Sequence, residues 1–119
     1  MKAVSIILKN SKGQILAVSR KTNHLDFGLP GGKIEDEDLN FDDAIRREVK
    51  EETGLEIYDL QIVHNDIWNG VEEYTYYGKY FGMIYTNEPH IVKWVHPIEI
   101  TKGSFGEYNK KVLTSLNLI

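Results

Sequence analysis

Three glutamates, Glu48, Glu51 and Glu52, lie close together in the sequence. Spacings of three and four residues place side chains on one side of an α-helix, within roughly a third of its circumference. Clustered carboxylates repel one another, so we expect Arg47, Lys50 or a bound cation to offset their charge. Because carboxylate oxygens are the ligands that Mg²⁺ and Mn²⁺ prefer, the spacing predicts a divalent-metal site. The alternative is an acidic helix face that only meets water.

Two glycines, Gly31 and Gly32, follow Pro30 and precede this acidic segment. Glycine has no Cβ, so its backbone can come close to a metal ion or a phosphate group. The alternative is a tight turn with no further role. A close-approach turn beside an acidic helix suits one task, which is to hold a divalent metal ion against a phosphate chain.

The same stretch resembles the signature of the Nudix hydrolases, G-x5-E-x7-R-E-U-x-E-E-x-G-U, in which U is an aliphatic residue. The run from Arg47 to Leu55 matches this signature without a gap. The resemblance implies that Mg²⁺ or Mn²⁺ neutralises a diphosphate and activates a water for attack at phosphorus. It also implies that Arg47 orients the acids and that the metal ligands are the Gly31 carbonyl and the carboxylates of Glu48, Glu51 and Glu52.

The match departs from the signature in the loop before the acidic helix. Counted forward from Gly32, the signature glutamate falls on Asp38, whereas counted back from Arg47 it falls on Leu39. We infer that this loop is one residue longer than the signature and that Glu37 or Asp38 takes the place of the glutamate. Loops tolerate such length changes.

Other residues are candidates for the same chemistry. Gly32, Lys33 and Arg20 are placed to contact substrate phosphates, although each charge alone could also be an ordinary surface charge. Many Nudix enzymes use a further acid, as a metal ligand or a general base, and Glu73 and Glu88 are the strongest candidates. Glu52 is the other candidate base.

An aromatic-rich segment could hold a nucleobase. Strands favour aromatic residues, so packing in the sheet is the default interpretation, and stacking on a base is the alternative. The segment contains Trp68, Tyr74, Tyr76, Tyr77 and Tyr80.

The acidic helix must be positioned by the rest of the chain. Asn40 is a suitable N-cap and Gly54 a suitable C′ residue, so we expect a helix between them. Its apolar residues recur at helical spacing and should face the core. They are Phe41, Ala44, Ile45 and Val49.

Several strands and a second helix are expected around it. The predicted strands cover residues 4–8 and 14–19, which form an opening hairpin, 57–68 and 74–85, with Asn69-Gly70 as the turn, and 91–95. Residues 23–28 are polar and are predicted to be a loop. An apolar stripe predicts a C-terminal helix. It consists of Phe105, Tyr108, Val112, Leu113 and Leu116.

These elements predict one α+β domain over residues 1–119, and the resemblance implies a mixed β-sheet sandwiched between α-helices. The net charge of −4 and the absence of a basic face argue against binding to duplex nucleic acid. No apolar run is long enough for a membrane span. The absence of cysteine is compatible with a reducing cytoplasm, which is the expected location. Monomer and homodimer both remain open.

The resemblance implies hydrolysis of a small-molecule nucleoside diphosphate derivative. We expect a (deoxy)nucleoside triphosphate, including oxidised ones, giving a nucleoside monophosphate and pyrophosphate, because a chain of 119 residues is close to a minimal domain. The alternatives are hydrolysis of ADP-ribose, another nucleotide-sugar or a dinucleotide, and a non-catalytic Nudix-like module that binds a nucleotide. Non-catalytic members generally lose helix carboxylates, and this chain retains them.

Overall fold

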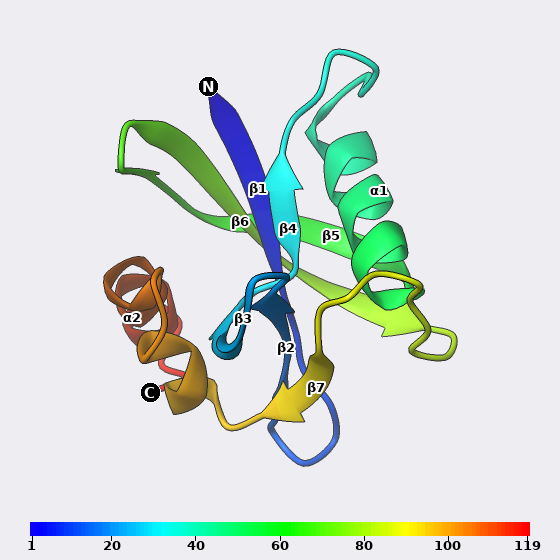
Figure 1. Cartoon of the computed structure of the whole chain (residues 1–119). Helices are drawn as coiled ribbons and strands as arrows, with labels where there is room; N and C mark the ends of the chain where they lie inside the picture. Colours follow the sequence, from blue (N-terminus) through cyan, green and yellow to red (C-terminus); the bar gives the residue numbers. More distant parts are fainter.

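The computed structural model describes the whole chain, Met1–Ile119, as two β-sheets with a helix on either side (Figure 1). The four-stranded sheet has the strand order β4-β1-β6-β5, and the three-stranded sheet has the order β3-β2-β7. The elements are β1 (Lys2–Leu8), β2 (Ile15–Arg20), β3 (Asn23–Gly28), β4 (Gly31–Lys33), α1 (Phe41–Thr53), β5 (Glu56–Trp68), β6 (Val71–Phe81), β7 (Val92–Val95), the 3₁₀ helix η1 (Pro97–Thr101) and α2 (Gly106–Ser115).

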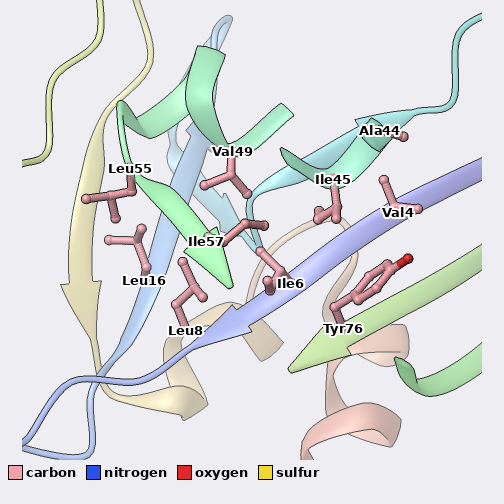
Figure 2. Packing of buried hydrophobic residues seen from close by; sticks show 10 residues of the cluster. All are labelled: Val4, Ile6, Leu8, Leu16, Ala44, Ile45, Val49, Leu55, Ile57 and Tyr76. Atoms are coloured by element: carbon pink, nitrogen blue, oxygen red, sulfur yellow. The ribbon is translucent and has the colours of Figure 1, made fainter. Parts of the chain in front are cut away.

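Strand β1 divides the core because its side chains alternate between the two faces of the sheet. Val4, Ile6 and Leu8 belong to the apolar cluster under α1, whereas Ile7 belongs to the cluster under α2. Figure 2 shows the first cluster between the helix and the strands. β1 runs parallel to β6 and antiparallel to β4, so the sheet is mixed. The predicted α+β fold, a mixed sheet between helices, is confirmed.

Helix α1 has the predicted limits. The side chain of Asn40 accepts a hydrogen bond from the Asp43 N–H, and Gly54 adopts the left-handed conformation while its N–H bonds to the Lys50 carbonyl. Ala44, Ile45 and Val49 are buried, so the helix is docked on the core, and Glu48 and Glu52 of the same helix are partly buried whereas Glu51 is exposed.

The prediction of an opening hairpin was wrong. β1 and β2 exist, but they belong to different sheets and are joined only by an isolated bridge between Lys9 and Ile15. Both edges of β1 are taken, by β4 and β6, so no edge is left for β2. Turn chemistry at residues 10–13 reverses the chain, but it does not decide which strands pair.

The predicted loop at residues 23–28 was also wrong, because this segment is strand β3. β3 pairs with β2 at one edge of the three-stranded sheet. All six of its residues are exposed or only partly buried, so it lacks the apolar pattern by which a strand is recognised.

The later elements agree more closely with the prediction from the sequence. β5 and β6 form the expected long hairpin, and Asn69 and Gly70 both have positive φ, as a tight two-residue turn requires. β6 ends at Phe81 rather than residue 85, and a connection leads from there to β7. α2 begins at Gly106 and contributes Tyr108, Val112 and Leu113 to the core. No helix has both the length and the apolar character needed to cross a membrane.

Candidate active site

A cavity of about 430 Å³ lies where the two sheets, the C-terminal part of α1 and the start of α2 meet. It is lined by Gly31 and Gly32 of β4 and by Glu52 of α1. Glu73 of β6 and Tyr108 of α2 also line it. Segments far apart in the sequence therefore share one cavity, and the acidic helix supplies part of its wall.

The glycines bring β4 close to its neighbours. Gly31 has a φ of +156°, and a Cβ there would lie 2.1 Å from the carbonyl oxygen of Val4 in β1. A Cβ on Gly32 would lie 2.6 Å from the carboxyl group of Glu48. Only residues without a side chain fit between β1 and the acidic helix, and the predicted approach of this backbone to a metal ion or a phosphate stays a prediction.

Glu52 is held by this glycine segment. The N–H of Gly31 donates a hydrogen bond of 2.8 Å to Oε1 of Glu52. Burial nevertheless raises the pKa of Glu52 to about 8, and the charges of Glu48 and Glu88 raise it further. Burial also raises the pKa of Glu48, with Arg47 acting in the opposite direction. Burial therefore disfavours the ionised forms of two neighbouring acids, and Arg47 offsets this in part at Glu48.

Arg47 is the centre of an ion-pair network. Its guanidinium donates to both carboxylate oxygens of Asp38, each at 2.9 Å, and to Glu48 at 2.9 Å. A weaker contact of 3.5 Å reaches Glu51. The hydrogen bonds from Arg47 lower the pKa of Asp38 to about 2. Glu37 is exposed and forms no side-chain hydrogen bond or ion pair, so of the two loop acids it is Asp38 that meets Arg47.

Comparison with known proteins agrees with this geometry. The family model of the NUDIX domain matches residues 1–115 of the chain. The chain belongs to the Nudix hydrolase family. It is therefore an enzyme of the class that the signature implied.

Among its Nudix relatives, the 8-oxo-dGTP diphosphatase of Buchnera aphidicola is 27% identical over 118 residues, which are 95% of this chain and 89% of the relative. An RNA pyrophosphohydrolase of Pseudomonas savastanoi is 42% identical over 60 residues, 50% of this chain and 36% of that protein. A solved MutT structure, from work on Aliivibrio salmonicida and Vibrio cholerae, has a TM-score of 0.78 at 20% identity and full coverage of both chains.

A solved ADP-ribose pyrophosphatase from Streptococcus suis also has this fold. Its TM-score is 0.71 at 17% identity, and the match covers 98% of this chain and 89% of the other. At such low identities the solved structures establish the shared fold alone.

Nudix hydrolases generally use divalent metal ions, and the donor groups here suit one. Glu48 and Glu52 offer carboxylate oxygens, the hard donors of Mg²⁺ sites. Their raised pKa values, chiefly from burial, show that a nearby cation would stabilise them. Glu51 is exposed and turned to Arg47, and no three acidic or histidine side chains are gathered closely enough to hold an ion. Glu48 and Glu52 are thus the carboxylates that could hold such a metal, and the predicted ligand role of the Gly31 carbonyl stays a prediction.

The connection between β6 and β7 caps the C-terminal end of α1. The last carbonyl groups of a helix have no partner within it. Here the Tyr85 N–H donates to the Thr53 carbonyl at 2.8 Å, and Nε2 of His90 lies 2.7 Å from the Glu52 carbonyl. The connection fixes the helix end that carries Glu52. His90 was not predicted as a site residue, because nothing in its local sequence indicates a partner 38 residues away.

Of the other predicted site residues, some line the cavity and some lie outside it. Arg20 lines the cavity and forms a 3.9 Å ion pair with Asp26, whereas Lys33 does not line it. Glu88 lies outside the cavity and forms an ion pair with Lys21, although its charge reaches Glu52. Glu73, the other candidate for a further acid, is buried within β6 and lines the cavity.

The aromatic residues that line the cavity were not those expected. The residues proposed to stack on a base, Trp68, Tyr74, Tyr76, Tyr77 and Tyr80, all pack in the two apolar clusters and none lines the cavity. The default interpretation of these residues, packing in the sheet, is therefore the one that the structure supports. Phe27, Phe105 and Tyr108 line the cavity instead. Tyr108 stood in the predicted apolar stripe of the last helix, but that stripe did not distinguish core from cavity.

Proposed function

We propose that this Nudix hydrolase is an Mg²⁺-dependent (or Mn²⁺-dependent) pyrophosphohydrolase of nucleoside triphosphates, oxidised ones included. It would release a nucleoside monophosphate and pyrophosphate. The observation that carries the proposal is the placement of Glu52, which is bonded to the Gly31 N–H at one wall of a cavity of about 430 Å³. A carboxylate fixed beside a backbone that can approach phosphate, with room beyond it for a ligand, suits a phosphate anhydride.

The residues have separate tasks in this proposal. Glu48 and Glu52 would hold the metal ion, and Glu51 would join them if it left Arg47. The metal, when bound, supplies charge neutralisation and lowers the pKa of a bound water. Gly31 orients Glu52 through its N–H, and Arg47 orients Glu48 through a 2.9 Å hydrogen bond.

Two further observations support this substrate class. The Buchnera relative that matches nearly the whole chain is named an 8-oxo-dGTP diphosphatase. The cavity extends past the acidic helix to Phe27 and Tyr108, whose rings are suitable neighbours for a nucleobase.

The non-catalytic alternative is less well supported. All three helix glutamates and Arg47 are present, and two of the glutamates lie where a cation would stabilise them. A second catalytic candidate is removal of pyrophosphate from the 5′ end of RNA, because the RNA pyrophosphohydrolases share 42% identity over half of the chain.

The test is a nucleotide panel assayed with Mg²⁺, with Mn²⁺ and with chelator, and with the products identified by chromatography. The panel contains nucleoside triphosphates, 8-oxo-dGTP, ADP-ribose and a 5′-triphosphorylated oligonucleotide. We expect turnover of a triphosphate to monophosphate and pyrophosphate, and a loss of kcat of about 10²-fold or more in Glu52→Gln. Glu37→Gln, an exposed acid without partners, is the matched control. Metal-independent turnover, or full activity in Glu52→Gln, would contradict the proposal.

A further inference from the structure

Glu73 is the buried carboxyl group that the proposed metal chemistry does not use. It lies in β6, lines the cavity and is 6% exposed. Its carboxylate forms no hydrogen bond and no ion pair with the chain, and burial alone raises its pKa. Its backbone carbonyl is satisfied by Asn65, so the side chain alone lacks a partner.

A mostly buried carboxyl group without a protein partner is costly. The fully buried polar atoms without a partner are Nε2 of His64 and Nε1 of Trp68 only, so the oxygens of Glu73 remain open to the cavity. The polar groups beside it do not offset this cost, because they are bonded to one another. Oγ of Ser5 lies 2.9 Å from Oγ1 of Thr75, which lies 2.8 Å from the hydroxyl of Tyr108. Glu73 is near enough for its charge to raise the pKa of Tyr108, but no bond joins the two. The missing partner is therefore expected from a ligand in the cavity.

Strand register separates Glu73 from the metal-binding carboxylates. Gly31, which holds Glu52, pairs with Ser5 of β1, whereas Glu73 pairs with Ala3 of the same strand. Glu73 is thus two strands across and two residues along from Gly31, which is about 12 Å between the Cα atoms at standard strand spacings. Neither carboxyl group contributes to the pKa shift of the other, so we place Glu73 apart from the metal-binding pair. It lies where the part of a ligand remote from the phosphates would lie.

We propose that Glu73 is a specificity-determining residue that binds the nucleobase, and that it selects a base whose edge presents two adjacent N–H donors. The carboxylate only accepts hydrogen bonds and has two oxygens, so it fits a pair of donors side by side. Guanine presents such a pair, N1–H and N2–H, on its Watson–Crick edge, whatever atom is at C8. Adenine and cytosine present one donor beside one acceptor, and the acceptor would face the carboxylate.

The surroundings of Glu73 suit a base. Phe27 and Phe105 also line the cavity and provide apolar ring surfaces. Asn109 is buried beside Tyr108, and its Nδ2 donates to the Ile100 carbonyl at 3.0 Å, which fixes the start of α2 against the preceding 3₁₀ helix. The wall opposite the strands is thereby held in place, as discrimination between bases requires.

This inference rests on the proposed function for its kinetic test, but not for its binding test. The first measurement is binding of dGMP and dAMP, without metal or turnover, to the wild-type protein and to Glu73→Gln. Glutamine keeps the size of the side chain and replaces one acceptor with a donor. We expect tighter binding of dGMP by the wild type, a loss of about 10-fold or more in Glu73→Gln, and little change for dAMP. The control is Glu72→Gln, its partly exposed neighbour.

The second measurement is kcat and KM for dGTP, 8-oxo-dGTP and dATP. We expect Glu73→Gln to raise KM for both guanine nucleotides while kcat changes little, and Glu73→Asp, which withdraws the carboxylate by one methylene, to give a smaller effect in the same direction. Thermal unfolding of each variant shows whether the fold is kept, and neutral glutamine should be tolerated because burial disfavours the charge.

The outcomes separate the two proposals. Equal binding of dGMP and dAMP by the wild type, or a Glu73→Gln protein that retains the preference, would overturn the role of Glu73 and leave the hydrolase proposal intact. A fall in kcat shared by all nucleotides would also overturn it, because Glu73 would then act on the chemistry. Selective binding without turnover of any nucleotide would refute the hydrolase proposal alone.

Discussion

The ion pair between Asp38 and Arg47 allows a quantitative test of the departure from the signature. Both carboxylate oxygens of Asp38 accept hydrogen bonds of 2.9 Å, and its side chain is only 4% exposed. A carboxyl group whose pKa falls from 3.8 to about 2 on folding contributes about 2 kcal/mol of stability at neutral pH. We therefore expect Asp38→Asn to lower the free energy of unfolding by about 2 kcal/mol, or somewhat less because asparagine can still accept one hydrogen bond.

The folded and unfolded pKa values of Asp38 also determine how its contribution to stability depends on pH. Because the pKa is lowered in the folded state, the stabilisation is fully present above the unfolded value of 3.8 and is lost as the pH falls through about 2. The difference between wild type and Asp38→Asn should thus be constant at neutral and mildly acidic pH. It should shrink below about pH 4.

Urea unfolding followed by circular dichroism at a series of pH values measures both quantities. Glu37→Gln is the control, since the adjacent acid has no partner and its removal should change stability by less than about 0.5 kcal/mol. An equal loss in the two variants would show that the assignment of Asp38 is wrong. A loss in Asp38→Asn that persists unchanged to the lowest pH would show that the charge of the carboxylate is not its source.

Two further predictions concern the glycines and the acidic pair. Gly31→Ala places a Cβ 2.1 Å from the Val4 carbonyl oxygen, so we expect a loss of about 3 kcal/mol or more in thermal unfolding, whereas Gly28→Ala, with nothing within 4 Å, is the tolerated control. Because burial raises the pKa of Glu52 to about 8, the metal-free protein should lose stability as the pH rises towards that value, and Glu52→Gln should not show this loss. Mg²⁺ should restore the melting temperature of the wild type more than that of Glu52→Gln; no effect of the metal on either would contradict its placement.

The sequence predicted those features that depend on neighbouring residues. Helix α1 was found within one residue because Asn40 and Gly54 act on adjacent backbone groups. The Asn69-Gly70 turn was found for the same reason. Strand pairing was not found, since the partners of β1 are β4 and β6, and that choice is made by packing between distant segments. β3 was missed because an exposed edge strand requires no apolar pattern.

The features of the site also differ in whether neighbouring residues determine them. The acids of the helix could be assigned from their spacing, but the cavity beside them could not. It is formed by residues from β1, β2, β3, β4, β6 and α2 that share no local pattern. Glu73 was a candidate further acid, but its burial in the cavity wall depends on strands that come together only in the folded chain.

Asp38 meets Arg47 although the loop before helix α1 departs from the signature. Aspartate is one methylene shorter than the signature glutamate, and this loop is one residue longer than the signature. The Asp38 N–H donates to the Glu35 carbonyl at 3.1 Å, and the Glu35 N–H donates to Oδ2 of Asp38 at 2.8 Å, so Asp38 is held in a closed turn. Counted from Gly32, Asp38 stands at the signature position, so the extra residue lies between Asp38 and Arg47. The closed turn presents both carboxylate oxygens of Asp38 to the Arg47 guanidinium, each at 2.9 Å, so the loop acid and Arg47 meet even though the segment between them is one residue longer than in the signature.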